Sequence, residues 1–377
     1  MIIKNASVYT PNFIFENKDV YIDGEFIAET ACEKESIDGS GCYLIPGLID
    51  IHFHGCAGYD FCDATSEALT HIGAYEIRNG ITSICPASMT LSESRLMEIC
   101  QNAVSYRNNW IPGKTASLCG INLEGPFISA KKKGAQNPVY IQTPDIDMFE
   151  RLLATADGLI KLTTIAPETE NALAFIRHFA NKVRISVGHT DCDYGVAHEA
   201  FMAGALHMTH LYNAMPALSH RNPGPIAAGM DSADVTAEII CDGIHIDPAA
   251  VRAAFALFGA ERIIFISDSM MATGMPDGDY ALGGLDVLVK GNLATLKDGT
   301  LAGSATNLMK CLQTAVWQMQ IPLETAIRCA TANPAKAIGV YDRIGSIETG
   351  KYADLVLLDK KTLEPVKIFS HGIEILQ

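Results

Sequence analysis

The chain has 377 residues, of which 48% are hydrophobic and 19% are charged, so it can bury a large core and does not resemble a disordered protein. Its formal net charge of −15 argues against a nucleic-acid partner, because the phosphate backbone favours a basic surface. No apolar run long enough to span a membrane is present, and the first residues do not resemble a signal peptide.

The eleven cysteines are scattered along the chain without a C-x-x-C pair. This pattern is typical of reduced thiols in a cytoplasmic protein and not of a disulfide framework or a zinc knuckle. We therefore expect a cytoplasmic protein with no membrane partner.

The two ends of the chain have a different character from its middle. Residues 1–45 predict short strands separated by turn signals such as Asp23-Gly24, and residues 344–377 show the same pattern. We expect both ends to form one small β-sandwich domain beside a larger domain that spans residues 46–343.

The stretch LIPGLIDIHFHG, residues 44–55, ends an apolar run with two histidines. Successive side chains of a strand point to opposite faces, so His52 and His54 share one face and Phe53 lies on the other. Two imidazoles at the end of a buried strand favour a metal site over a core position.

Eight short β-branched runs follow one another through the middle of the chain, and helical patterns separate most of them. In one such helix, Asp247 is the expected N-cap, Pro248 the first helical residue and Gly259 the end. This alternation predicts an α/β fold, a (β/α)8 TIM-like barrel. A doubly wound sheet is the alternative, although no G-x-G-x-x-G follows a strand. The eight runs are residues 48–54, 81–87, 118–124, 159–168, 183–189, 205–210, 237–243 and 262–268.

Polar side chains close several of these strands, at the end of a barrel where catalytic groups gather. Taken alone, each histidine fits a hydrogen-bonded core position better, but Glu124, His189 and His210 together favour a metal centre. Such ligands suit zinc, iron, cobalt or manganese and leave a position for water. Asp268 ends the last strand, where it can move a proton or cap a helix.

Several motifs then resemble a known family. PGLIDIHFHG is similar to the first-strand signature of the amidohydrolase superfamily. Together, six further motifs resemble those of the N-acetylglucosamine-6-phosphate deacetylases, in the same order and between residue 46 and about residue 306. These motifs are LEGPF, KKKGAQNP, VGHT, THLYNAMP, DGIHID and SDSM.

The resemblance implies a divalent metal, zinc first, held by Glu124, His189 and His210. It also implies that Asp268 is the catalytic acid and base. His52 and His54 match the members of the family that hold two metals, so one or two ions per subunit are expected, with Glu124 able to bridge them.

The resemblance also implies a substrate site. Asn213, Ala214, Arg221 and His245 match residues that contact the phosphate or the sugar, Ala214 through its backbone. The family's arginine reaches across a dimer interface, so a homodimer is expected. Gln136 stands where some members have a histidine that helps to hold the substrate carbonyl, and an amide can donate an N–H there.

The expected reaction is hydrolysis of the acetamide of N-acetylglucosamine 6-phosphate to glucosamine 6-phosphate and acetate, in amino-sugar catabolism or cell-wall recycling. A deacetylase for the galactosamine epimer, another amidohydrolase and a non-catalytic scaffold are the alternatives. The fourth strand carries only Lys161, well before its end. The absence of a metal-bridging lysine disfavours a dihydroorotase or a hydantoinase.

Overall fold

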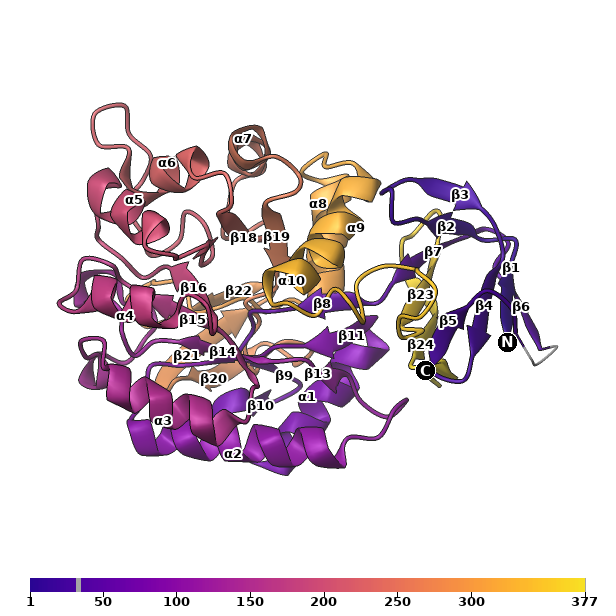
Figure 1. Cartoon of the computed structure of the whole chain (residues 1–377), viewed down its shortest axis with the longest axis horizontal. Helices are drawn as coiled ribbons and strands as arrows, with labels where there is room; N and C mark the ends of the chain where they lie inside the picture. The colour runs from indigo at the N-terminus through magenta and orange to yellow at the C-terminus, as the bar shows by residue number, and fades with distance from the viewer. Residues whose placement is uncertain (32–34, 377) are drawn as a thin grey trace.

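The computed structural model describes residues 1–31 and 35–376, which form a barrel and a smaller β domain beside it (Figure 1). Both ends of the chain lie in the β domain, at the right of Figure 1. Among the described residues, no helix is long and apolar enough to cross a membrane. The ten cysteines described are all free thiols, and the eleventh, Cys32, lies outside the described residues.

The β domain consists of two sheets that share one core. Strand β7 pairs antiparallel with β23, with Leu44 opposite Leu357, and this pairing joins the two ends of the chain. Ile3, Leu355 and Phe369 belong to the core that both sheets bury. The first sheet, in the order β5-β4-β1-β6, contains β1 (Ile2–Lys4), β4 (Val20–Asp23), β5 (Phe26–Ala28) and β6 (Ser36–Asp38). The second, in the order β25-β24-β23-β7-β2-β3, contains β2 (Ser7–Tyr9), β3 (Phe15–Asn17), β7 (Cys42–Pro46), β23 (Leu355–Asp359), β24 (Pro365–Ser370) and β25 (Ile373–Glu374).

The barrel contains a parallel strand at each of the eight predicted runs, and the predicted fold class is confirmed. The strands pair in the orders β13-β11-β8 and β12-β14-β15-β16-β17-β18-β19. The backbone N–H of Asp268 donates to the carbonyl of His52 at 2.9 Å, which joins the last strand end to the first. The domain limits of residues 45/46 and 343/344 stay a prediction. The strands are β8 (Leu48–Asp50), β11 (Ile81–Ile84), β12 (Ala87–Ser88), β13 (Ser117–Leu118), β14 (Ile121–Glu124), β15 (Ile160–Ile165), β16 (Arg184–Val187), β17 (His207–Met208), β18 (Thr236–Ile240) and β19 (Ile263–Ile266).

Helices surround the barrel, and their ends follow the expected signals. In α7, Asp247 accepts a hydrogen bond from the N–H of Ala249 at 2.7 Å, and Gly259 ends the helix with φ of 74°. The helices are α1 (Ser66–Arg78), α2 (Glu93–Asn109), α3 (Ile146–Ala156), α4 (Ala172–Phe179), α5 (Tyr194–Met202), α6 (Gly224–Asp231), α7 (Pro248–Phe258), α8 (Leu308–Trp317), α9 (Leu323–Ala330) and α10 (Ala332–Ala337). Three short 3-10 turns are η1 (Phe61–Asp63), η2 (Ala130–Lys132) and η3 (Pro138–Tyr140).

Two small antiparallel elements lie outside the predicted pattern. Strands β9 (Gly55–Cys56) and β10 (Tyr59–Asp60) form a hairpin directly after the histidine pair. After the last barrel strand, β20 (Gly278–Leu282), β21 (Leu285–Lys290) and β22 (Leu293–Thr295) form a three-stranded sheet. Leu282 of this sheet lines the pocket described below, so the sheet contributes a wall to it.

Candidate active site

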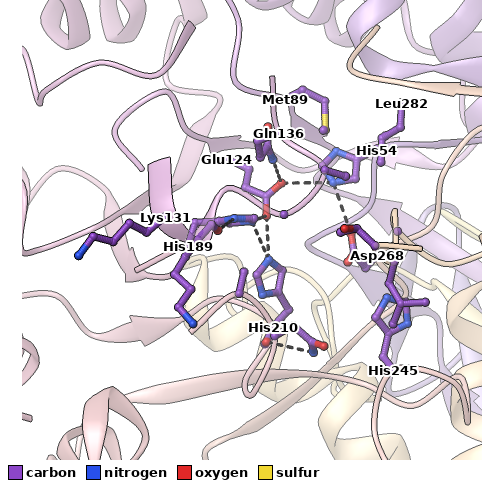
Figure 2. Close-up of a pocket in the computed structure, with 18 residues that line it drawn as sticks. His54, Met89, Glu124, Lys131, Gln136, His189, His210, His245, Asp268 and Leu282 are labelled. Atoms are coloured by element: carbon purple, nitrogen blue, oxygen red, sulfur yellow. Dashed lines mark hydrogen bonds and ion pairs between the residues drawn. The ribbon is translucent and has the colours of Figure 1, made fainter. Parts of the chain in front are cut away.

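A cavity of about 360 Å³ opens at the carboxyl ends of the barrel strands, where the chemistry of such barrels gathers (Figure 2). It brings together side chains from strand ends that are far apart in the sequence. Most of the site residues expected from the sequence line it: His54, Glu124, Gln136, His189, His210, Asn213, Ala214, His245 and Asp268.

Glu124, at the end of β14, lies at the centre of this cluster. Its Oε1 is 3.0 Å from the Nε2 atoms of both His189 and His210, and its Oε2 is 3.3 Å from Nε2 of His54. Burial raises the pKa of the Glu124 carboxyl, but the neighbouring imidazoles, His52 first, outweigh it and hold the pKa well below its usual range. Glu124 is therefore an ionised carboxylate surrounded by ring nitrogens.

His189 and His210 present the same ring atom to one point. Their Nε2 atoms lie 3.1 Å apart, and Nδ1 of His189 donates to the carbonyl of Lys132 at 2.8 Å. That hydrogen bond fixes the tautomer of His189 and leaves its Nε2 lone pair directed at the cluster, as in metal-binding histidines. Glu124, His189 and His210 thus form a group whose ligand atoms are close enough to hold one metal ion.

A second group with the same property contains His52, His54 and Glu124. His52 donates from Nδ1 to Oε2 of Glu238 at 2.8 Å, and His54 donates from Nδ1 to the carbonyl of Ala87 at 3.1 Å. His52 Nε2 is fully buried, lies 3.3 Å from Glu124 Oε1 and has no hydrogen-bond partner among the described residues. A buried ring nitrogen of this kind fits a metal ligand.

Asp268 lies beside this second group. Its Oδ1 is 3.3 Å from Nε2 of His54 and 3.9 Å from Nε2 of His52. Burial raises the pKa of Asp268, but the hydrogen bond with His54 and the charges of the histidines lower it below the usual value. Asp268 is therefore ionised and able to accept a proton at the mouth of the cluster.

The backbone at three of these strand ends adopts a left-handed conformation that side-chain-bearing residues seldom use. The φ angles are 44° at His189, 26° at His210 and 49° at Asp268. Such conformations cost free energy and gather at functional sites, where the surrounding structure maintains them. Here they turn each side chain from the end of its strand into the cavity.

Gln136 is buried and tied to the same carboxylate. Its Nε2 donates to Glu124 Oε2 at 2.6 Å, and its Oε1 accepts a hydrogen bond from the N–H of Thr90 at 2.7 Å. The amide is thereby fixed in orientation, with its nitrogen toward the cluster. Sequence reasoning placed Gln136 near the substrate carbonyl but did not foresee its contact with Glu124.

The residues expected to contact the phosphate line one side of the cavity, except for Arg221. His245 donates from Nδ1 to Asp242 at 2.7 Å, and Asp242 also accepts the backbone N–H of His245 at 2.9 Å. Burial lowers the pKa of His245, but the hydrogen bond with Asp242 outweighs it and raises the pKa above its usual value. Asn213 and Ala214 lie in the turn after β17, whereas Arg221 is exposed in the loop before α6 and outside the lining of the cavity.

Glu238 is a functional candidate that the sequence analysis missed. It is fully buried in β18, and its Oε1 lies 3.1 Å from Nε2 of His207. Its Oε2 accepts from His52 and, at 3.1 Å, from the backbone N–H of His210. The signal in the sequence is a single glutamate within the apolar run AEIIC, a position where an unpaired charge would be costly.

Comparisons with known proteins agree with this geometry. A family model described as "Amidohydrolase family" matches residues 43–376. N-acetylglucosamine-6-phosphate deacetylase of Bacillus subtilis is 37% identical over 369 residues, which are 95% of this chain and 93% of that protein. N-acetylgalactosamine-6-phosphate deacetylase of Escherichia coli O157:H7 is 34% identical over 317 residues, 84% of this chain and 83% of that protein.

Solved structures show the same likeness. A mutant of N-acetyl-D-glucosamine-6-phosphate deacetylase from Mycobacterium smegmatis, in complex with N-acetyl-D-glucosamine-6-phosphate, superposes with a TM-score of 0.91 at 31% identity, covering 100% of this chain and 99% of that one. The enzyme from Pasteurella multocida gives a TM-score of 0.93 at 29% identity with the same coverage. The chain therefore belongs to the amidohydrolase family, in the branch that contains the N-acetylglucosamine-6-phosphate deacetylases.

Proposed function

We propose that this chain is a metal-dependent deacetylase that hydrolyses the acetamide of N-acetylglucosamine 6-phosphate to glucosamine 6-phosphate and acetate. The observation that carries the proposal is the pair of histidine–carboxylate groups that share Glu124, with the ionised Asp268 beside them in one cavity. Relatives with this activity, similar over almost the whole chain, support the choice of substrate. The free thiols of the described residues support a reducing, cytoplasmic setting.

Glu124, His189 and His210 would hold one divalent cation, and His52, His54 and Glu124 would hold a second. Imidazole nitrogens with a carboxylate suit zinc, and iron, cobalt and manganese accept the same ligands. When bound, such a cation supplies Lewis acidity, which polarises a carbonyl and makes water more acidic.

Asp268 is the proposed general base and general acid. As an ionised carboxylate it takes a proton from the water that attacks the acetamide carbon. The C–N bond then breaks, and the same carboxyl delivers its proton to the departing amine, which leaves acetate and a free amino sugar. One group can perform both transfers because the water and the leaving nitrogen are bonded to the same carbon.

Gln136 is the proposed donor to the carbonyl oxygen as negative charge develops on it. The amide nitrogen has two hydrogens, and the contact with Glu124 uses one of them. The second hydrogen serves an oxyanion, and the fixed orientation of the amide means that little reorganisation is needed at that moment.

Phosphate binding is assigned to Asn213, the backbone of Ala214, His245 and Arg221 of the partner subunit in a homodimer. His245 keeps its proton to higher pH than an ordinary histidine, because Asp242 stabilises the charged ring. Arg221 is exposed and outside the cavity of its own chain, which leaves it available to a neighbouring copy. Binding the distant phosphate would position the amide for attack.

A deacetylase of N-acetylgalactosamine 6-phosphate is the second candidate, because one relative of comparable identity has that activity. The test is acetate release from both 6-phosphorylated epimers by the metal-replete protein. A higher kcat/KM for the glucosamine epimer supports the proposal. A higher value for the galactosamine epimer would replace it with the second candidate, and no acetate from either would contradict both.

A further inference from the structure

A second large cavity lies at the opposite, amino-terminal end of the barrel strands, where the barrel meets the β domain. Its volume is about 450 Å³, which exceeds the 360 Å³ of the catalytic cavity. Its walls come from the start of β15, the end of α2, the segment after α10 and the turns of the β domain. The residues that matter here are Arg107, Trp110, Lys161, Arg343, Tyr352 and His371.

The charge of this cavity is opposite to that of the whole protein. Arg107, Lys161 and Arg343 line it, and none of its described lining residues is an aspartate or a glutamate. An adjoining cavity of about 390 Å³ shares Lys161, and it likewise has only basic charged residues among those described in its lining. The chain has 43 acidic and 28 basic residues, so a purely cationic lining in two neighbouring cavities is unexpected for a random surface.

Lys161 is the central cation because it lines both cavities. Its aliphatic stem packs over Gly120, where an added Cβ would lie 2.5 Å from Lys161 Cγ. A side chain at residue 120 would displace the lysine, so the glycine gives the stem its place. Lys161 has no hydrogen bond or ion pair among the described residues, which leaves its ammonium charge uncompensated in a half-buried position.

The two arginines of the cavity differ in how firmly they are held by other residues. Arg107 is only 32% exposed, and it donates to the Asp157 carboxylate at 2.6 Å, the Asp157 carbonyl at 2.9 Å and Asn108 Oδ1 at 3.2 Å. Arg343 lies 3.9 Å from Asp342, and both of these side chains are more than half exposed. An exposed, long pair such as Arg343–Asp342 contributes little free energy, so an anion can compete for the Arg343 guanidinium. Guanidinium groups also match phosphate geometry well.

Three aromatic side chains of the cavity lining, His371, Tyr352 and Trp110, pack against one another. The ring of His371 stacks on Tyr352 with 4.0 Å between centroids and meets Trp110 edge-on at 4.8 Å. His371 is also held by Asp354, at 3.2 Å from its Nδ1. Because these side chains are fixed by one another, a ligand would not have to pay for ordering them.

We propose that this cavity is a binding site for a small phosphorylated anion, centred on Lys161 and separate from the catalytic site. The ligand's phosphoryl group binds the Lys161 ammonium and the guanidinium of Arg343. A half-buried site strengthens such charge-assisted hydrogen bonds relative to bulk water.

In the test, inorganic phosphate is titrated into the metal-replete protein, and binding is measured by isothermal titration calorimetry. Lys161→Met should keep an aliphatic stem over Gly120 while removing the charge. We expect this variant to lose one of the phosphate-binding events of the unchanged protein, or to bind phosphate in that event about tenfold or more weakly. Lys310→Met is the matched control, since Lys310 pairs with Glu364 at 2.7 Å and lines neither cavity. Arg343→Gln is a second variant that should weaken the same event.

Acetate release by Lys161→Met should equal that of the unchanged protein, which also shows that the variant folds. Phosphate titrations that are the same for the unchanged protein, Lys161→Met and Arg343→Gln would overturn the proposal. Crystals soaked in tungstate, a heavy phosphate analogue, give the position directly. An anomalous peak beside Lys161 supports the proposal, and peaks confined to the catalytic cavity contradict it.

Discussion

The two ends of the barrel hold cavities of different charge character. At the carboxyl ends, Glu124 and Asp268 face four histidines, and left-handed backbone turns aim side chains inward. At the amino ends, the described lining around Lys161 contains cations and no carboxylate, and the acidic partners of Arg107 and Arg343 lie outside that lining. At the carboxyl ends, charges of both signs lie within contact distance and hold one another in place, whereas the half-buried Lys161 has no ion pair among the described residues.

The largest effect should come from removing the proposed proton carrier. Asp268→Asn keeps the size of the side chain but cannot take a proton, so kcat should fall about a thousandfold or more. Metal content, measured by inductively coupled plasma mass spectrometry, should stay that of the unchanged protein. If most of the rate survived, the assignment of Asp268 as the proton carrier would be wrong.

The next effect should come from the carboxylate behind the histidines. Glu238→Gln weakens the hold on His52 and on the backbone of His210, and changes to such supporting groups typically cost about 10- to 100-fold in metal affinity or activity. Competition with a chelator measures the affinity. Glu93→Gln is the control, because Glu93 is paired with Arg151 at the surface. Equal metal affinity in both variants would contradict the supporting role of Glu238.

A smaller effect is expected from Arg221, which would contact the phosphate in the partner subunit's site. Arg221→Ala should raise KM for the phosphorylated sugar about tenfold or more, through the loss of a charge-assisted hydrogen bond. The rate with unphosphorylated N-acetylglucosamine should not change. Mixed dimers sharpen the test, because Arg221→Ala chains combined with Asp268→Asn chains should regain one complete site. Equal losses of kcat/KM with the phosphorylated and the unphosphorylated sugar would contradict a role of Arg221 in phosphate binding.

The last prediction concerns stability and not activity. Glu76 in α1 is fully buried, neither of its carboxyl oxygens has a hydrogen-bond partner among the described residues, and burial raises its pKa to about 8. Between its usual pKa near 4.5 and about 8, the folded state therefore binds more protons than the unfolded state. The free energy of unfolding should fall as pH rises through this window, by at most about 1.4 kcal/mol per pH unit from this group.

Glu76→Gln removes that proton linkage. Its melting temperature should fall less than that of the unchanged protein between pH 5 and pH 8, measured by calorimetry. A melting temperature that changes with pH in parallel for both proteins would show that Glu76 does not titrate in this window. The activity of the variant serves as a control, since Glu76 does not line the catalytic cavity.

The sequence predicts the barrel well because its information is local. Each strand is a β-branched run with a polar residue at its end, and the geometry of a barrel brings Glu124, His189 and His210 together once the runs are read as strands. The metal-ligand and catalytic roles of these residues stay predictions, as do those of Asp268, His52 and His54.

Other features depend on contacts that no short stretch contains. In the sequence, Glu238 is an isolated charge in an apolar strand, and its role is visible only once the fold places its carboxylate beside His52 and His207. In the sequence, Lys161 was noted only because it lies too early in its strand to bridge two metals. The fold packs its stem over Gly120 and places it in a cavity that Arg107 and Arg343 also line. The sheet formed by β20, β21 and β22 was also missed, because it follows a run of turn residues after the last barrel strand and interrupts the alternation of strands and helices.

Metal dependence is tested by a metal titration of the chelator-treated protein, with acetate release from N-acetylglucosamine 6-phosphate measured at each step. We expect almost no activity without metal and a rise in activity that saturates at one or two equivalents of zinc per chain. Glu124→Gln, which alters the residue shared by both groups, should show neither tight binding nor activity. Full activity of the metal-free protein would show that the reaction does not depend on a metal ion.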